Sequence, residues 1–272
     1  MKVTLTEVLK DLRGLYDIED RFQRFDAYRA LAIGETRGEY RPIGTFSPMG
    51  ERQADYLDRL LALDAERLAR VSADEVAADF ALLPDKFRLM LVVADESRNG
   101  WTERNLTDAQ WRFTLKDDTL PRNVVMKDFD RWVTVLLWTD IEATEDYVKR
   151  ETRAALYRAL HFCYVGSPKT LQEMMQQEGR VLAYAGYTPT SSPEELAYSR
   201  EVIQPHLQSS EFPVCFAALY GDEAARDAGY EPLGLESKAG FQLALADGLR
   251  QNDPERWLLQ VDDSQHSRQM HL

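Results

Sequence analysis

Hydrophobic and polar positions follow each other along most of this chain with the period of an amphipathic helix. Leu57, Leu60 and Leu68 recur at helical spacing, and charged residues fill the positions between them. The same period returns from residue 143 onward, and residues 4–15 and 18–33 mix apolar and charged positions without alternation. The pattern therefore predicts a mostly helical protein.

Several serine-containing motifs mark predicted helix starts. A serine can cap a helix, and a proline that follows it loses nothing at the first helical position, where the N–H has no partner within the helix. Three such pairs occur, at Ser47-Pro48, Ser167-Pro168 and Ser192-Pro193. A fourth start is predicted at Ser72, because Ser72-Ala73-Asp74-Glu75 has the form of a capping box.

Short runs of strand-forming residues interrupt the helical pattern. The clearest are RLMLVVA at 88–94 and WVTVLLW at 132–138, and PVCFAAL at 213–219 predicts a third buried strand. Alternation at 111–115 and a short apolar stretch at 124–126 indicate weaker strands, the latter joined to 132–138 as a hairpin. These elements predict an α+β fold with helices packed around a small mixed or antiparallel sheet of three to five strands.

The chain shows no repeat, low-complexity tract or long linker that would divide it. Its character changes after Leu83-Pro84, which predicts a helical N-terminal part over 1–82 and an α+β part on a small sheet over 83–262. The polar tail at 263–272 is expected to be flexible. We expect the first two parts to form one compact body.

The balance of charge bears on the class of partner. A formal net charge of −13 repels phosphate backbones, so nucleic acid is not expected as a ligand. The N-terminal residues lack the apolar core of a signal peptide, and no stretch is apolar enough to span a membrane, so we expect a cytoplasmic protein without membrane association. Cys163 and Cys215 lie in apolar surroundings and are expected to be buried free thiols.

The common catalytic fingerprints are absent from the sequence. It contains no P-loop, no dinucleotide-binding glycine motif, no H-E-x-x-H, no G-x-S-x-G and no C-x-x-C. Their absence argues against the better-marked nucleotide, zinc-protease and serine-hydrolase classes, but it leaves open whether the protein is an enzyme. No stretch carries the motifs of a family that we can name.

Acidic residues follow both clear strands. Asp95 and Glu96 follow the first, and Asp140 follows the second. If the two strands are parallel neighbours, these carboxylates converge and could hold Mg²⁺ or Mn²⁺, with Arg98 and Arg104 meeting an anionic substrate. Acids also follow strands commonly as turn formers and helix caps. A metal-assisted hydrolase acting on an anionic small molecule is therefore the alternative functional hypothesis.

The leading hypothesis is a soluble cytoplasmic binding or interaction protein without a cofactor. Its recognition surface would be the polar loop at 95–111, which contains two tryptophans and two arginines that could contact a partner. These residues are Arg98, Trp101, Arg104 and Trp111. Aromatic and arginine side chains supply much of the binding energy at protein interfaces. The sequence leaves open whether the partner is a protein or a small molecule, and it leaves the oligomeric state open.

Overall fold

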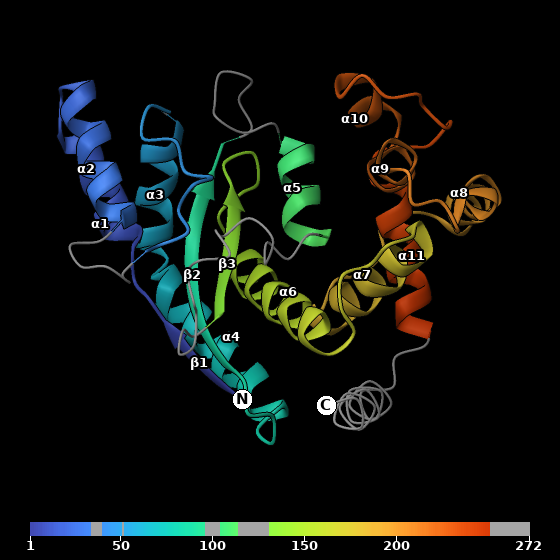
Figure 1. Cartoon of the computed structure of the whole chain (residues 1–272), viewed down its shortest axis with the longest axis horizontal. Coiled ribbons are helices and arrows are strands. Elements are labelled where there is room, and N and C mark those ends of the chain that lie inside the picture. The colour runs from blue at the N-terminus through green and yellow to red at the C-terminus, as the bar shows by residue number, and fades with distance from the viewer. Residues whose placement is uncertain (34–39, 51, 96–103, 114–130, 251–272) are drawn as a thin grey trace, which may run out of the picture. The chain divides into compact units, whose positions relative to one another are not determined.

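The computed structural model divides the chain into two compact units (Figure 1). Unit 1 contains Met1–Arg104 and Asn123–Leu156, and unit 2 contains Asn105–Arg122 and Tyr157–Leu272. The residues that the structure describes are 1–33, 40–50, 52–95, 104–113 and 131–250. Within these ranges lie eleven α-helices and three strands, and all three strands belong to unit 1.

The described strands form one sheet with the order β1-β2-β3, and both pairings are parallel. The strands are β1 (Lys2–Leu5), β2 (Lys86–Ala94) and β3 (Arg131–Trp138). Every residue of β2 from Leu89 to Ala94 is buried. A strand that is covered on both faces of a parallel sheet is expected to be continuously apolar, and this explains why RLMLVVA shows no alternation.

The predicted mixed or antiparallel sheet is therefore wrong. The connection from β2 to β3 is long and includes helix α5 (Arg104–Phe113). A crossover of a dozen or more residues is what parallel neighbours require. The short stretch at 124–126, predicted to form a hairpin with β3, lies outside the described residues.

The predicted strand at 213–219 is a helix, α9 (Phe212–Tyr220). Its residues from Cys215 to Tyr220 are all buried. A segment buried on all sides shows neither the helical nor the strand period, so the sequence pattern could not distinguish the two. Pro213 fits the first turn of a helix, as the structure shows. The strand predicted at 111–115 is also wrong for the residues that the structure describes, because Trp111 and Phe113 belong to α5.

The N-terminal segment differs from its prediction in a similar way. Residues 2–5 form β1, and the first helical segments are α1 (Leu9–Gly14) and the 3₁₀ turn η1 (Leu15–Asp17). The predicted helix at 18–33 is confirmed as α2 (Arg21–Ile33). Four residues are too few for a period to be recognised, and β1 is defined only by its parallel pairing with β2.

One of the four predicted helix starts is confirmed. Ser192 caps α8 (Pro193–Ile203) in a capping box with Glu195. Thr170 rather than Ser167 caps α7 (Leu171–Ala185), and Ser72 lies inside α4 (Ala65–Asp79). Ser47-Pro48 precedes a turn, and α3 (Arg52–Ala62) begins five residues after that serine.

Unit 1 packs helices against its sheet. Helix α3 lies beside β2, and α4 packs against β1 (Figure 1). The stripe on α3 that faces inward consists of Gln53, Tyr56, Leu57 and Leu60. The first part of α6 (Glu145–Tyr164) also belongs to unit 1. Leu57 and Leu60 were predicted on this face, whereas Tyr56 and the polar Gln53 were not.

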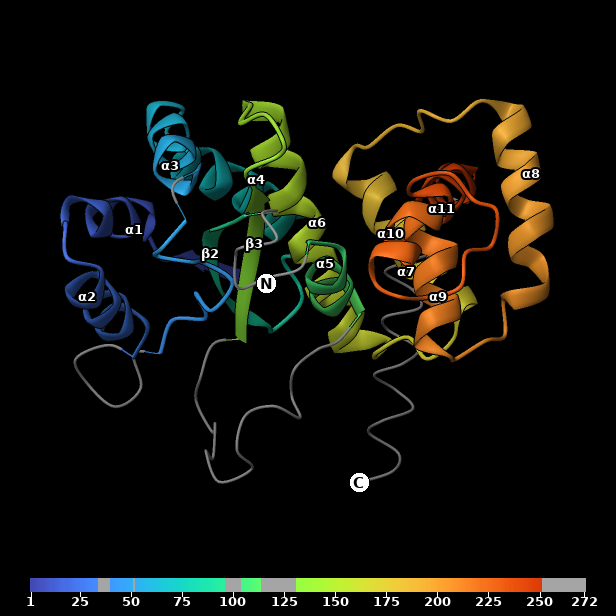
Figure 2. The ribbon, with the colours of Figure 1, turned by 90° about the horizontal axis from the view of Figure 1, so that it is seen from above.

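The described part of unit 2 is helical. Helix α11 (Ala239–Arg250) contacts α7, α8 and α9, which surround it in Figure 2. The 3₁₀ turn η2 (Gln204–His206) follows α8, and α10 (Asp222–Asp227) follows α9. Helices α7 and α11 cross so closely that a Cβ on Gly179 would overlap the carbonyl oxygen of Ala244.

We predict that Gly179→Ala destabilises unit 2 by about 1–3 kcal/mol, because the added methyl group forces two helix backbones apart. Thermal unfolding followed by circular dichroism measures the loss. Gly14→Ala is the matched control, since Gly14 has a helical backbone and nothing lies within 4 Å of its added Cβ. An equal response of both variants would show that the close crossing does not limit stability.

Candidate functional site at the carboxyl edge of the sheet

The carboxyl ends of β2 and β3 lie side by side. Ala94 pairs with Trp138 at the end of the ladder, and Thr139 N donates a hydrogen bond to Ala94 O at 3.0 Å. The condition that the strands at 88–94 and 132–138 are parallel neighbours is therefore met. Ligands of open parallel sheets bind beyond the carboxyl ends of the strands, so a binding site is expected at this edge.

Asp95 directly follows the central strand and is only 4% exposed. Its Oδ1 accepts a hydrogen bond of 2.7 Å from Thr139 Oγ1, which follows the neighbouring strand. Its Oδ2 faces Gly50, where an added Cβ would lie 3.5 Å away. Because Gly50 stands two residues before α3 begins, the positive end of that helix favours a carboxylate here.

Gln53 lies beside Asp95 and is completely buried in the first turn of α3. Its Oε1 accepts a hydrogen bond of 3.0 Å from the Tyr16 hydroxyl, and its Nε2 has no partner. The Cβ position of Gly50 is 3.4 Å from Cδ of Gln53, so the amide and the Asp95 carboxylate flank the same point. Turning the amide over would only exchange which of its two polar atoms lacks a partner.

Gly50 lies at the end of segment 43–50, and buried side chains of this segment anchor it in unit 1. Ile43 and Phe46 are fully buried, and the Phe46 ring meets the Tyr16 ring edge to face. The Tyr16 hydroxyl also lies 3.2 Å from Ser47 O. Burial raises the pKa of Tyr16. The positive charge of Arg24 lowers this pKa, and the negative charge of Asp95 raises it further. Tyr16 therefore stays protonated at neutral pH and serves as a hydrogen-bond donor.

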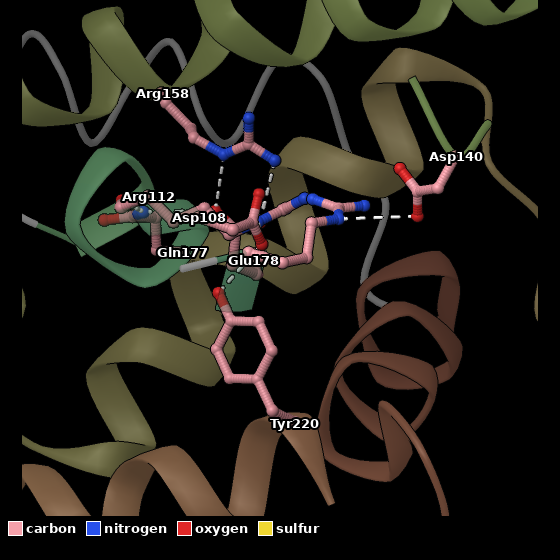
Figure 3. Close-up of polar contacts among 8 residues, drawn as sticks. Asp108, Arg112, Asp140, Arg158, Gln177, Glu178 and Tyr220 are labelled. Atoms are coloured by element: carbon pink, nitrogen blue, oxygen red, sulfur yellow. Dashed lines mark hydrogen bonds and ion pairs between the residues drawn. The ribbon is translucent and has the colours of Figure 1, made fainter. Parts of the chain in front are cut away.

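Asp140 lies at the same edge but is already paired. Its Oδ2 is 3.5 Å from Nε of Arg104, an ion pair drawn in Figure 3. The Arg104 guanidinium also stacks over the Trp138 ring, 4.0 Å from its centroid. The Arg104 side chain is 11% exposed, so it is held inside unit 1 rather than offered to a partner.

Tyr56 adds a buried hydroxyl to the carboxyl edge. It is 3% exposed, and its hydroxyl has no hydrogen-bond partner. Burial raises the pKa of Tyr56, and the Asp140 charge raises it further. Since α3 presents Tyr56 one turn after Gln53, a single helix supplies two buried polar groups without full hydrogen bonding.

The structure describes four of the seven predicted site residues. Asp95 and Asp140 share the carboxyl edge, while Arg104 pairs with Asp140. Trp111 is half-buried on α5 and belongs to unit 2. The other three, Glu96, Arg98 and Trp101, lie outside the described residues. Across the described ranges, no group of three or more His, Cys, Asp or Glu side chains is placed to hold a metal ion.

The sequence interpretation missed Tyr16, Gly50, Gln53 and Thr139. A signal for Gln53 was present, because positions 53, 56, 57 and 60 form one helical stripe and glutamine is its only amide. A polar residue on the apolar face of a helix needs a partner, and this makes it a candidate for function. Tyr16, Gly50 and Thr139 carry no such signal, since only the tertiary fold brings them to Asp95.

A second cluster of buried charges lies in unit 2, around Glu178 of α7. Glu178 is fully buried and accepts hydrogen bonds from Arg158 Nε at 2.7 Å and Nη2 at 2.9 Å (Figure 3). Arg112 Nη1 donates a third at 2.6 Å. Burial raises the pKa of Glu178, but the two guanidinium groups outweigh it and hold the pKa below its usual value. The carboxylate is therefore ionised at neutral pH.

Asp108 completes this buried ion network. It accepts hydrogen bonds from Arg112 Nε at 2.6 Å and from the Tyr220 hydroxyl at 2.8 Å. Two carboxylates thus face two guanidinium groups, and the network of Asp108, Arg112, Arg158 and Glu178 carries no formal net charge. Its side chains come from α5, α6 and α7, and Tyr220 ties it to α9. We assign this network to the stability of unit 2.

Neither cysteine is part of a thiol site in the described structure. Neither Cys163 nor Cys215 forms a disulfide bond, and Cys215 is buried as expected, whereas Cys163 is half-buried. Burial raises the pKa of Cys215, which keeps it in the unreactive thiol form. Burial also lowers the pKa of His161 to about 4, so this histidine is neutral near pH 7.

Comparisons of the chain with protein-family models, curated proteins and solved structures find no match. None of the helices in the described ranges combines the length and the apolar character needed to cross a membrane. The geometry of the carboxyl edge is therefore the basis for assigning a function to this chain.

We predict that Glu178→Gln destabilises unit 2 by roughly 3–5 kcal/mol, because it leaves buried guanidinium charge without compensation. Urea unfolding followed by circular dichroism measures the change. Glu201→Gln, at an exposed position on α8, serves as the control and should change stability by less than about 0.5 kcal/mol. A Glu178 variant as stable as this control would contradict the assigned role of the network.

Proposed function

We propose that unit 1 binds a small polar molecule at the carboxyl edge of its parallel sheet, with Asp95 as the anchoring group. The observation that carries this proposal is the Gln53 amide, whose Nε2 is buried without a hydrogen-bond partner, beside the Asp95 carboxylate, a residue only 4% exposed. A buried polar group without a partner costs about 1–3 kcal/mol, which a ligand that bonds to it would recover.

The position of these groups supports a ligand site rather than a purely structural cluster. The carboxyl ends of parallel strands are where sheets of this kind bind their ligands, and sites commonly combine apolar walls with a few converging polar groups. Here the buried Phe46 ring packs against Tyr16, whose hydroxyl donates to Gln53.

This proposal differs from the recognition surface predicted at 95–111. Arg104 is engaged by Asp140 and Trp138, which removes one of the expected contact residues. Arg98 and Trp101 lie outside the described residues, so a protein-binding role for that loop stays a prediction. The geometry of the described residues favours a small ligand over a protein partner, because the polar groups that need bonds are buried.

We predict that Asp95→Asn abolishes ligand binding while the protein remains folded. The test is a thermal-shift screen with D-ribose, adenosine, glycerol, methylammonium and inorganic phosphate at millimolar concentration. At least one of these should raise the melting temperature of the unaltered protein and leave that of Asp95→Asn unchanged, since binding to the folded state stabilises it.

Asp55→Asn is the control for this experiment, because Asp55 lies on the exposed face of α3, two residues from Gln53. Its shifts should equal those of the unaltered protein, and circular dichroism shows that both variants are folded. The proposal is contradicted if no compound shifts the melting temperature, or if the shifts survive in Asp95→Asn.

A metal-assisted hydrolase acting on an anionic small molecule is the second candidate. The observation in its favour is that Asp95 and Asp140 follow adjacent parallel strands. Mg²⁺ is commonly held by one or two carboxylates together with water and substrate phosphates, so Asp95 and Asp140 are ligands of the right chemical type. The pairing of Asp140 with Arg104 argues against this use, since the arginine already neutralises the carboxylate.

If this second candidate holds, millimolar Mg²⁺ or Mn²⁺ raises the melting temperature, and Asp95→Asn and Asp140→Asn each remove the effect. Metal at about 100 times its dissociation constant stabilises the folded state by about 2.7 kcal/mol, which differential scanning calorimetry detects readily. Chelation with EDTA should reverse the shift, and Asp55→Asn should keep it. The absence of a shift in the unaltered protein would eliminate this candidate.

A further inference from the structure

His161 is a buried histidine in the part of α6 that belongs to unit 2. It is 5% exposed, whereas His206, the other histidine that the structure describes, is half-buried in the same unit. Histidine is the side chain whose charge ordinarily changes between about pH 5 and 8. Burial of this ring therefore couples the packing of unit 2 to pH.

The Nδ1 atom of His161 is buried and has no hydrogen-bond partner. A neutral imidazole tolerates this position, because one of its two nitrogens carries no hydrogen and therefore requires no acceptor. A protonated ring carries a hydrogen on both nitrogens. Protonation would thus create a donor at Nδ1 that reaches neither an acceptor nor solvent, and a buried donor without a bond is unfavourable, more so when it is charged.

The charged groups around His161 do not compensate a positive ring. Among the described residues, Glu178 and Arg180 of α7 act on it electrostatically. Arg180 is positive and opposes protonation. Glu178 favours it, but this carboxylate already accepts three hydrogen bonds from Arg158 and Arg112. A proton on His161 would add positive charge beside guanidinium groups whose carboxylate is already engaged.

The resulting effect on stability has a definite sign. Burial, assisted by Arg180, lowers the pKa of His161 to about 4, whereas an exposed histidine has a pKa near 6.5. The unfolded chain therefore binds this proton more readily than the folded chain. The stabilising contribution is complete above about pH 6.5 and is lost as the pH falls toward 4.

We propose that His161 is an acid-sensitive switch in unit 2: the neutral ring permits the packing of α6 on α7, and protonation of the ring in mildly acidic solution releases it. The two helices are joined there by Arg158 and Glu178 (Figure 3) and by the rings of Tyr157 and Tyr184, whose centroids are 5.5 Å apart. This switch goes beyond the ligand site proposed for unit 1 and does not depend on it.

NMR titration of the full chain measures the protonation of His161 in the folded protein. Single substitutions of His206, His266 and His271 by glutamine assign the ring signals of the four histidines without altering residue 161. The His161 signal should remain that of a neutral ring from pH 7.5 down to about pH 5. A ring that titrates near pH 6.5 in the folded protein would overturn the proposal.

Urea unfolding at pH 7.5 and pH 5.0 tests the effect on unit 2. Hydrogen exchange of peptides from residues 157–185 follows the unfolding of this unit. A change in pKa from about 6.5 to about 4 makes the folding equilibrium constant roughly 30-fold smaller at pH 5.0 than at pH 7.5. His161→Leu removes the titrating ring and should lack this decrease. Comparing the two pH values within each variant cancels any loss of packing that the substitution itself causes.

Glu178 does not produce the same dependence, because its pKa is held below the usual value and it stays ionised between pH 5.0 and 7.5. His206→Gln is the matched control and should keep the roughly 30-fold decrease, since it removes a ring outside the buried cluster. An equal dependence on pH in His161→Leu and the unaltered protein contradicts the switch. If His161→Leu does not fold, the NMR titration decides, because it needs no change at this position.

Discussion

The parallel pairing of β2 with β3 is the constraint on which the candidate site depends. It aligns Ala94 with Trp138, and the residues that follow the two strands are thereby brought to one edge. The hydrogen bond from Thr139 to Asp95 is a direct result of this alignment, because the two residues follow paired strand ends. In an antiparallel pair, the end of one strand would face the start of the other, and Asp95 and Asp140 would lie at opposite ends of the ladder.

The helix that covers this edge contributes hydrogen-bonding groups at an energetic cost. Gln53 and Tyr56 occupy inward positions on α3 that a leucine could fill, yet each leaves a polar atom buried without a bond. Burial of an unsatisfied polar group is unfavourable, so such a group in a folded protein calls for an explanation, such as a catalytic role, local strain, or a water or ion that completes the bonding. The neutral, paired charges around Glu178 in unit 2 are a contrasting case, since there the described side chains supply the partners themselves.

The sequence predicted the features that have a clear local cause. The strands at 88–94 and 132–138 were predicted because each is a short apolar run that contains β-branched residues, which favour strands. The run at 213–219 has similar composition but is a helix in the core of unit 2, so local pattern alone did not distinguish them. Strand direction, the strand at 2–5 and the meeting of Gln53 with Asp95 depend on contacts between distant residues, and no local property of the chain encodes these. Asp95 and Asp140 could be named in advance because each directly follows a recognisable strand.

The ion network of unit 2 has a consequence for how this sequence can diverge. Asp108, Arg112, Arg158 and Glu178 share their hydrogen bonds, so the loss of any one leaves an opposite charge buried and uncompensated. A lysine could not take the place of Arg158, because it cannot donate to both oxygens of Glu178 in the same planar geometry. Replacing all four residues together by apolar side chains of similar volume costs far less stability than replacing any one of them alone. Related chains should therefore either keep all four charges or have lost them together.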